Sequence, residues 1–391
     1  MWMSSGGKDQ DLKAQLRALQ LCMTADKRPI GFFLGAGCPL AIQISNAGSP
    51  QPLIPDIHGL TTMVNQKLNT AVDHKSVIKA LNTLCAEASI QKPTIEDYLN
   101  RLRNIVAIGG LETVRGVTPV QAKLTDKEIC GIIAQAVGIE LPDLSTPYHA
   151  LARWIRGIPR VSPVEIFTPN YDLLFEQSLE ECGVPYFDGF VGARRAFLDF
   201  EAMDATHSDK ASLPSRWARL WKLHGSINWH RNTDGKIWRG EGGSDGELLI
   251  YPSQDKYSQS RRMPFLAMLD RLKAFLARPE AVLVICGYSF VDEHFNAMLR
   301  EGLRGNSRAV IFALVYGNLD DTHPAIPLAE EAPNFLLLGS DRAIIGGNVG
   351  TWTNSSPKTN ADNFELGDFA KLGAFLSSVS GQSLTSISDA T

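Results

Sequence analysis

Short apolar runs alternate with segments of helical periodicity along most of the chain. Residues 11–23, DLKAQLRALQLCM, repeat apolar side chains at the spacing of an amphipathic helix, and residues 29–34 then form an apolar run that enters a glycine turn. Further strand-like runs lie at residues 164–167, 219–225, 247–252, 281–287, 309–317 and 334–339. Several of these runs are continuously apolar, which is typical of a parallel sheet covered on both faces.

Between the first strand-like run and the second, the pattern is mostly helical. Residues 60–151 hold several segments of helical spacing, and Thr94 followed by Asp97 is typical of a helix start. The pattern predicts an α/β fold, a Rossmann-like doubly wound and mostly parallel sheet, with a large helical insertion at about residues 60–150. We expect one main domain over residues 1–345. A C-terminal extension, residues 346–391, is expected to be partly disordered because its end is rich in Ser and Thr.

Composition argues against several classes of function. The 391 residues carry 38 Lys plus Arg against 42 Asp plus Glu, so the formal net charge is -4 and gives no strong nucleic-acid signal. No apolar run is long enough to cross a membrane, and the first residues lack the pattern of a signal peptide, so we expect a cytoplasmic protein. The six cysteines form no CxxC pair, and buried free thiols are expected.

Four stretches rich in glycine or polar residues follow predicted strands. They are GAGC at 35–38, TPNYD at 168–172, HGSINW at 224–229 and GYSFVD at 287–292. Ligands of open α/β sheets lie outside the carboxyl ends of the strands, so the four stretches are expected to converge on one site. Structural interpretations stay open for each. Asn170 and Asp172 suit turn or helix-cap roles, His224 suits a structural histidine, and Ser289 suits a helix cap.

In this order, the four stretches resemble the sirtuin (silent information regulator) superfamily, most closely its branch in bacterial anti-phage defence systems. The resemblance covers roughly residues 30–338 and implies an NAD-binding domain with NAD+ as substrate and no prosthetic group. It implies that Gly35, Ala36 and Gly37 line the NAD+ site against the pyrophosphate and the nicotinamide ribose. Asn170 would then hold the ribose or the attacking water.

The same resemblance assigns the remaining candidate residues. Asp172 would organise the nicotinamide pocket, and His224 would act as the general base. Gly287 and Ser289 would support the adenosine side of the ligand. Asp56, in LIPDIHGLT, resembles the acidic residue of the flexible cofactor loop.

The sequence departs from the protein deacylases of this family. The zinc-binding CxxC pairs that help form their acyl-lysine cleft are absent, so we expect no metal and disfavour deacylation. Cleavage of the bond between nicotinamide and ribose remains, with water as the acceptor. An amide and a carboxylate can orient the ribose while positive charge develops on it, and a histidine can take the proton of the water.

The favoured hypothesis is therefore an NAD+ glycohydrolase that depletes NAD+ in anti-phage defence. The resemblance implies regulation by assembly, as a homo-oligomer or with a HerA-type ATPase. This chain contains no P-loop, so the ATPase would be a separate partner.

Two alternatives belong to other classes. One is a non-catalytic scaffold that senses NAD+ or ADP-ribose, although such a scaffold would not need a base. The other is a nuclease subunit of a defence complex, which would need clustered carboxylates around a metal; residues 95–102 supply only a helical acidic pair. His224 and His230 lack a third ligand nearby, so they are expected to be structural rather than metal-binding as a pair.

Overall fold

The fold is built on a large, mostly parallel sheet. The computed structural model describes residues 9–25, 27–46, 49–110, 112–158, 160–205, 213–214, 216–232, 234–240, 247–250, 264–353 and 363–380. Within them, a ten-stranded sheet has the order β1-β17-β16-β15-β14-β13-β2-β5-β9-β6. Its strands are β1 (Gln10–Asp11), β2 (Ile30–Leu34), β5 (Val164–Thr168), β6 (Tyr186–Phe187), β9 (Ala218–Lys222), β13 (Val282–Cys286), β14 (Val310–Leu314), β15 (Phe335–Leu338), β16 (Arg342–Ile345) and β17 (Asn348–Thr353). Only the β15–β16 and β16–β17 pairs are antiparallel in it.

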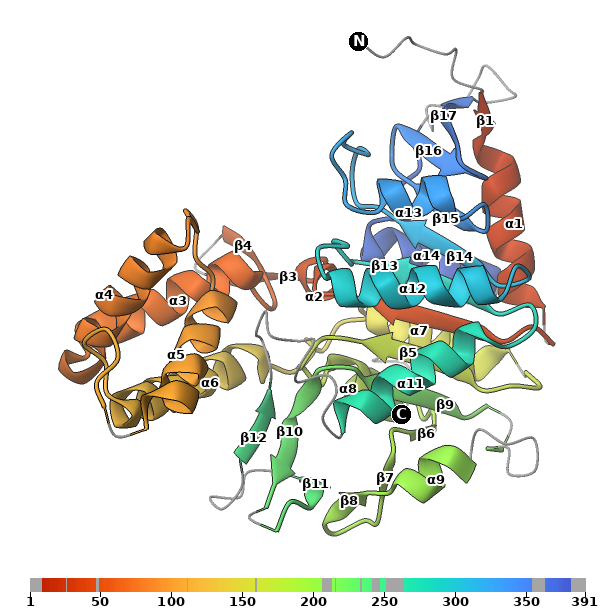
Figure 1. The fold of residues 1–391 in the computed structure, drawn as a ribbon. Coiled ribbons are helices and arrows are strands. Elements are labelled where there is room, and N and C mark those ends of the chain that lie inside the picture. The colour runs from red at the N-terminus through yellow and green to blue at the C-terminus, as the bar shows by residue number, and fades with distance from the viewer. Residues whose placement is uncertain are drawn as a thin grey trace, which may run out of the picture.

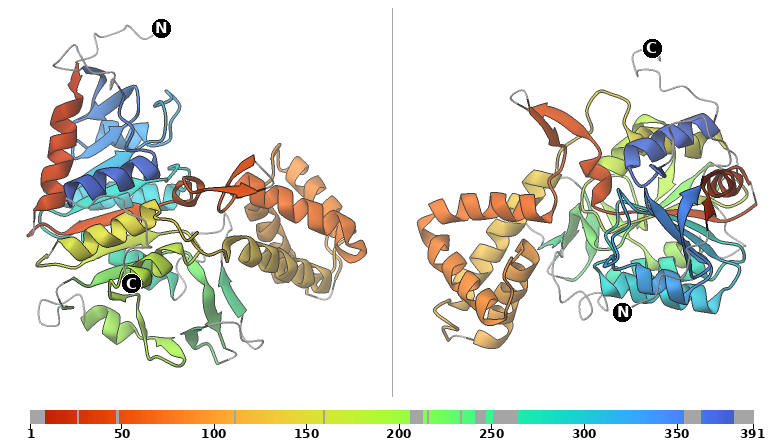
Figure 2. Two further views of the ribbon diagram at one scale, coloured as in Figure 1. Left: turned by 180° about the vertical axis from the view of Figure 1, so that it is seen from behind. Right: turned by 90° about the horizontal axis from the view of Figure 1, so that it is seen from above.

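Helices cover both faces of this sheet (Figures 1 and 2). One face carries α1 (Leu12–Thr24), α7 (Pro147–Gly157), α8 (Leu174–Glu181) and α14 (Phe369–Val379). The other carries α11 (Phe265–Leu276), α12 (Glu293–Gly305) and α13 (Ile326–Glu331). Successive side chains of β2 pack into the cores on opposite faces of the sheet. Phe32 packs on the first face and Phe33 on the second. The predicted doubly wound α/β fold is confirmed.

A second, smaller sheet lies beside the main one. It is five-stranded, in the order β12-β10-β11-β8-β7. Its strands are β7 (Phe190–Val191), β8 (Ala196–Leu198), β10 (Gly225–Arg231), β11 (Ile237–Arg239) and β12 (Glu247–Ile250). The predicted strand at 247–252 therefore belongs to this antiparallel sheet, and its last two residues lie outside the described part of the chain. The short helix α9 (Phe200–Ala205) follows β8.

The helical insertion forms a lobe beside the sheet, as Figure 1 shows. After the short helix α2 (Gly37–Leu40) and the hairpin of β3 (Gln43–Asn46) and β4 (Ser49–Pro52), the chain forms four helices. They are α3 (Ile57–Thr70), α4 (Val72–Glu87), α5 (Ile95–Gly109) and α6 (Pro119–Val137). The predicted start of α5 is confirmed, because Thr94 and Asp97 form a capping box. The lobe is shorter than predicted at its far end, because α7 packs on α14 against the main sheet.

Two elements beyond residue 345 are part of the main fold. β17 pairs with both β16 and β1, and the buried face of α14 packs on α7. The expected C-terminal extension therefore includes core structure. Residues 381–391, the Ser- and Thr-rich end, lie outside the described residues.

The apolar run of β5 contains one buried carboxylate, Glu165. Its oxygens lie 3.1 Å from Arg219 Nη1 and 2.9 Å from Arg278 Nη1, and Trp221 Nε1 donates to it at 2.8 Å. Burial lowers the pKa of Arg219, and Glu165 offsets part of that effect. A buried carboxylate needs such partners, so this cluster has a structural role at the start of the strand.

All six cysteines are free thiols. Four are buried, whereas Cys130 and Cys182 are partly exposed. In the described residues, no helix is both long enough and apolar enough to span a membrane.

Candidate functional site

The carboxyl ends of four neighbouring parallel strands meet at one edge of the main sheet. These strands are β13, β2, β5 and β9. The chain passes from β2 through the lobe to β5 on one side and later returns to β13 on the other. The boundary between β2 and β13 is therefore a topological switch point, where open α/β sheets bind ligands. Five predicted residues lie in loops at this edge, and we name them the carboxyl-end cluster: Gly35, Asn170, Asp172, His224 and Gly287.

The glycine loops after β2 and β13 pack directly against each other. Gly37 N donates to Gly287 O at 2.8 Å, and Gly35 N donates to Cys286 O at 2.9 Å. A Cβ atom added to Gly35 would lie only 2.3 Å from Gly287 O. Gly287 itself has φ of +68°, a conformation that favours glycine. The glycines are thus required by contact between two loops, whether or not a ligand also approaches them.

Asn170 connects the β5 loop to the β2 loop. Its Nδ2 donates to Gly35 O at 3.1 Å, and its backbone N donates to Thr168 Oγ1 at 3.1 Å. Thr168 Oγ1 in turn donates to Leu34 O at 2.7 Å. The side-chain amide is therefore held beside the switch point, while the residue stays partly exposed.

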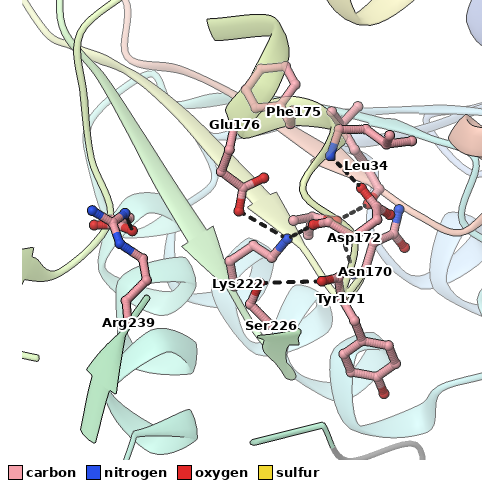
Figure 3. A network of polar contacts seen from close by, with 12 residues as sticks. Leu34, Asn170, Tyr171, Asp172, Phe175, Glu176, Lys222, Ser226 and Arg239 are labelled. Atoms are coloured by element: carbon pink, nitrogen blue, oxygen red, sulfur yellow. Dashed lines mark hydrogen bonds and ion pairs between the residues drawn. The ribbon is translucent and has the colours of Figure 1, made fainter. Parts of the chain in front are cut away.

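Asp172 is buried and acts within its own turn. Its Oδ1 accepts from Leu174 N, two residues further on, at 3.1 Å, so the turn interpretation of this residue is supported by its geometry, whereas the N-cap of α8 is Leu173. Burial raises the pKa of the Asp172 carboxyl, and the positive charge of Lys222 offsets part of that effect. Figure 3 shows Lys222 between Asp172 and Glu176.

His224 follows β9 and lies against the start of α12. Its ring stacks on Phe295 with centroids 4.9 Å apart, and its Nε2 lies 3.9 Å from Asp292 Oδ2. Asp292 also begins α12, because its Oδ1 accepts from His294 N at 3.0 Å. The ring is about nine-tenths buried, with negative charge beside it.

The other predicted residues are placed differently. Ala36 and Ser289 are exposed in the two glycine loops, and Gly37 is partly exposed. Ser289 is not the cap of α12, since Asp292 fills that position. Asp56 is exposed at the start of the lobe, where its Oδ1 accepts from Gly59 N of its own helix at 2.7 Å. The hydrogen bond from Gly59 N therefore gives Asp56 a capping role in α3, outside the carboxyl-end cluster.

Two residues at the same edge were not singled out from the sequence. Tyr316 follows β14, the strand next to β13, and is 76% exposed. The sequence signal that could have identified Tyr316 is its place as an aromatic residue between an apolar run and Gly317. Lys222, the last residue of β9, is 2% exposed. A lysine in an apolar run gave no sign that its ammonium group is buried.

Part of the chain matches a known family. Residues 164–335 match the model of the SIR2-like domain, and this range includes Asn170, Asp172, His224, Gly287 and Ser289. The match supports the predicted sirtuin-like character of this part of the chain. Among solved structures, the chain is similar to one described as "Structural Basis for the Mechanism and Regulation of Sir2 Enzymes". That likeness has 11% identity and a TM-score of 0.38, and covers 94% of this chain and 100% of the other. No curated protein gives a significant match.

In the part of the chain that the structure describes, no group of three or more His, Cys, Asp or Glu residues is placed to hold a metal ion. The side chain of His230 stacks on Trp238, with ring centroids 4.5 Å apart in the smaller sheet. This contact gives His230 a packing role.

Proposed function

We propose that this chain hydrolyses NAD+ to ADP-ribose and nicotinamide. The observation that carries the proposal is the placement of His224 and Asn170 at the switch point, next to the Gly35 and Gly287 loops. The SIR2-like match over residues 164–335 supports NAD+ as the ligand.

In the proposed reaction, water replaces nicotinamide on the ribose. The bond between the ribose carbon and the nicotinamide nitrogen breaks, its electron pair leaves with neutral nicotinamide, and the ribose takes on oxocarbenium character. Asn170 orients the ribose or the water, since its amide is fixed against Gly35 O. His224 accepts the proton as the water oxygen bonds to the ribose carbon, and Asp292 places negative charge beside the imidazolium.

The Gly35–Gly37 loop is proposed to face the pyrophosphate and the nicotinamide ribose, with Ala36 at its exposed point. Gly287 and Ser289 are proposed to support the adenosine. Asp172 shapes the nicotinamide side through its turn rather than as a proton carrier. Asp56 is proposed to reach the ligand only through movement of the segment between β4 and α3, because it caps α3 here.

Asn170→Ala is expected to lower kcat for nicotinamide release by about 10²-fold, because loss of a positioning group misplaces the reacting atoms. The rate is measured by chromatography of nicotinamide and ADP-ribose. Gln20→Ala, which removes an exposed amide side chain of α1, is the control and should keep the wild-type rate. Equal rates in Asn170→Ala and wild type would remove Asn170 from the site.

Tyr316→Ala is expected to raise KM for NAD+ by about tenfold, while Tyr316→Phe stays near wild type. We propose that this exposed ring stacks on the adenine, a contact typically worth about 1–3 kcal/mol. Steady-state kinetics with NAD+ measures the effect. An unchanged KM in the alanine variant would place the adenine elsewhere.

We further propose that the activity serves anti-phage defence in the cytoplasm by depleting NAD+. Regulation is proposed to come from assembly, as a homo-oligomer or with a HerA-type ATPase. The lobe of α3 to α6 is the proposed assembly surface, because it projects beside the main sheet. Co-expression with a genomic neighbour, followed by size-exclusion chromatography and an NAD+ assay, tests this.

A further inference from the structure

A buried ammonium group lies next to the proposed site and has no role in the reaction described above. It belongs to Lys222, whose residue is 2% exposed at the end of β9. Burying a lysine costs free energy unless its charge is paired and hydrogen-bonded. Lys222 is two residues before His224, in the strand that leads to the proposed base.

Lys222 connects two segments that flank the site. Its Nζ donates to the backbone carbonyl of Asp172 and lies 3.2 Å from Glu176 Oε1 in α8 (Figure 3). Burial raises the pKa of Glu176, and Lys222 offsets part of that effect. Glu176 Oε2 is buried and has no hydrogen-bond partner among the described residues, and the Lys222 ammonium lies against the other carboxylate oxygen as the counter-charge.

The turn from Asn170 to Asp172 is held from two sides. Tyr171 O accepts from Ile227 N at 3.1 Å and from Ser226 Oγ at 3.3 Å. The Asn170 amide donates to Gly35 O from the other side. Lys222 adds the charged contact to this set, at the carbonyl of Asp172. The same lysine therefore joins the turn that bears Asn170 to the strand that leads to His224.

We propose that Lys222 is a positioning residue of the NAD+ site. Its ammonium fixes the Asn170–Asp172 turn relative to His224, and Glu176 is the counter-charge that holds it there. This inference rests on the proposed function for its effect on catalysis. The inference that Lys222 fixes the turn rests on the contacts of Lys222 alone and does not depend on the proposed function.

A substitution of Lys222 alone is a poor test, because it would leave Glu176 buried without its counter-charge and could unfold the chain. The double variant Lys222→Met with Glu176→Leu removes both charges at similar volume. Replacing a buried ion pair in this way is often neutral for stability. A second variant, Glu176→Gln, keeps the side-chain shape and one oxygen acceptor but removes the counter-charge.

The experiment compares thermal unfolding, hydrogen exchange of peptides that contain residues 168–173, and NAD+ kinetics. The double variant should keep a Tm within a few degrees of wild type and exchange the turn amides about tenfold faster. Its kcat should fall by about 10²-fold while KM changes less than about threefold. Glu176→Gln should also speed the exchange of the turn amides and lower kcat, each by a smaller factor than in the double variant. The matched control, Lys273→Met with Glu301→Leu, removes an exposed pair of the same type and should leave all three unchanged.

Wild-type exchange and wild-type kcat in a folded double variant would overturn the proposal. If the double variant fails to fold, wild-type exchange and kcat in Glu176→Gln overturn it instead. A wild-type protein that never cleaves NAD+ contradicts the proposed function. In that case the exchange of the turn amides still decides whether Lys222 positions the turn.

Discussion

Replacing His224 with alanine is expected to lower kcat for nicotinamide release by about 10²–10⁴-fold, the range that general acid–base groups contribute. The reason is the loss of the proposed proton acceptor, which lies 3.9 Å from Asp292 and at the same sheet edge as Asn170. Binding of NAD+ should persist, because the glycine loops remain. Single-turnover kinetics and calorimetric titration of NAD+ separate the two effects.

The controls for His224 separate chemistry from folding. Gln20→Ala, at an exposed position of α1 outside the lobe, should leave kcat unchanged. His224→Gln retains a polar side chain that can stack on Phe295 but cannot serve as the base, so it should be nearly as slow as alanine. A His224→Gln protein with the wild-type rate would contradict the assignment of the base.

Gly35→Ala is expected to lower the free energy of unfolding by roughly 1–3 kcal/mol, the usual cost of overpacking. The added Cβ would lie 2.3 Å from Gly287 O, so the loops after β2 and β13 must separate. Because both loops belong to the proposed NAD+ site, nicotinamide release should fall as well. Chemical denaturation and the NAD+ assay measure the two losses.

Gly305→Ala is the matched control for this substitution. A Cβ at Gly305 meets no heavy atom within 4 Å, and the residue ends α12. Its unfolding free energy should stay within about 0.5 kcal/mol of wild type. A Gly35→Ala protein as stable and as active as Gly305→Ala would refute the close contact of the two loops.

The central strands of the main sheet were predictable because they are continuous apolar runs. β2, β5 and β13 each lie between helices on both faces, so every residue of these runs is buried. The packing of α7 was not predictable. Its periodicity shows a helix with an apolar face, but only the fold shows that α14 covers that face instead of the lobe. Helical spacing identifies a buried face and leaves its partner open.

The position of the carboxyl-end cluster at one edge of the sheet was predictable where local chemistry is distinctive, at glycines and at Asn170. The reason why position 35 requires glycine was not predictable from the sequence. That reason is the close contact with Gly287, a residue distant in the sequence. Asp56 and Ser289 have exposed positions that the sequence could not foretell. Lys222 is buried only because Glu176 and the Asp172 carbonyl come together around it, which is a tertiary effect.

The most direct test of the account is the fate of NAD+ with the purified chain, alone and together with a co-expressed genomic neighbour. The account predicts equal amounts of nicotinamide and ADP-ribose, formed by wild type and lost in both Asn170→Ala and His224→Ala. NAD+ that binds but remains intact in every assembly would contradict it, and would make the carboxyl-end cluster a binding site without hydrolysis.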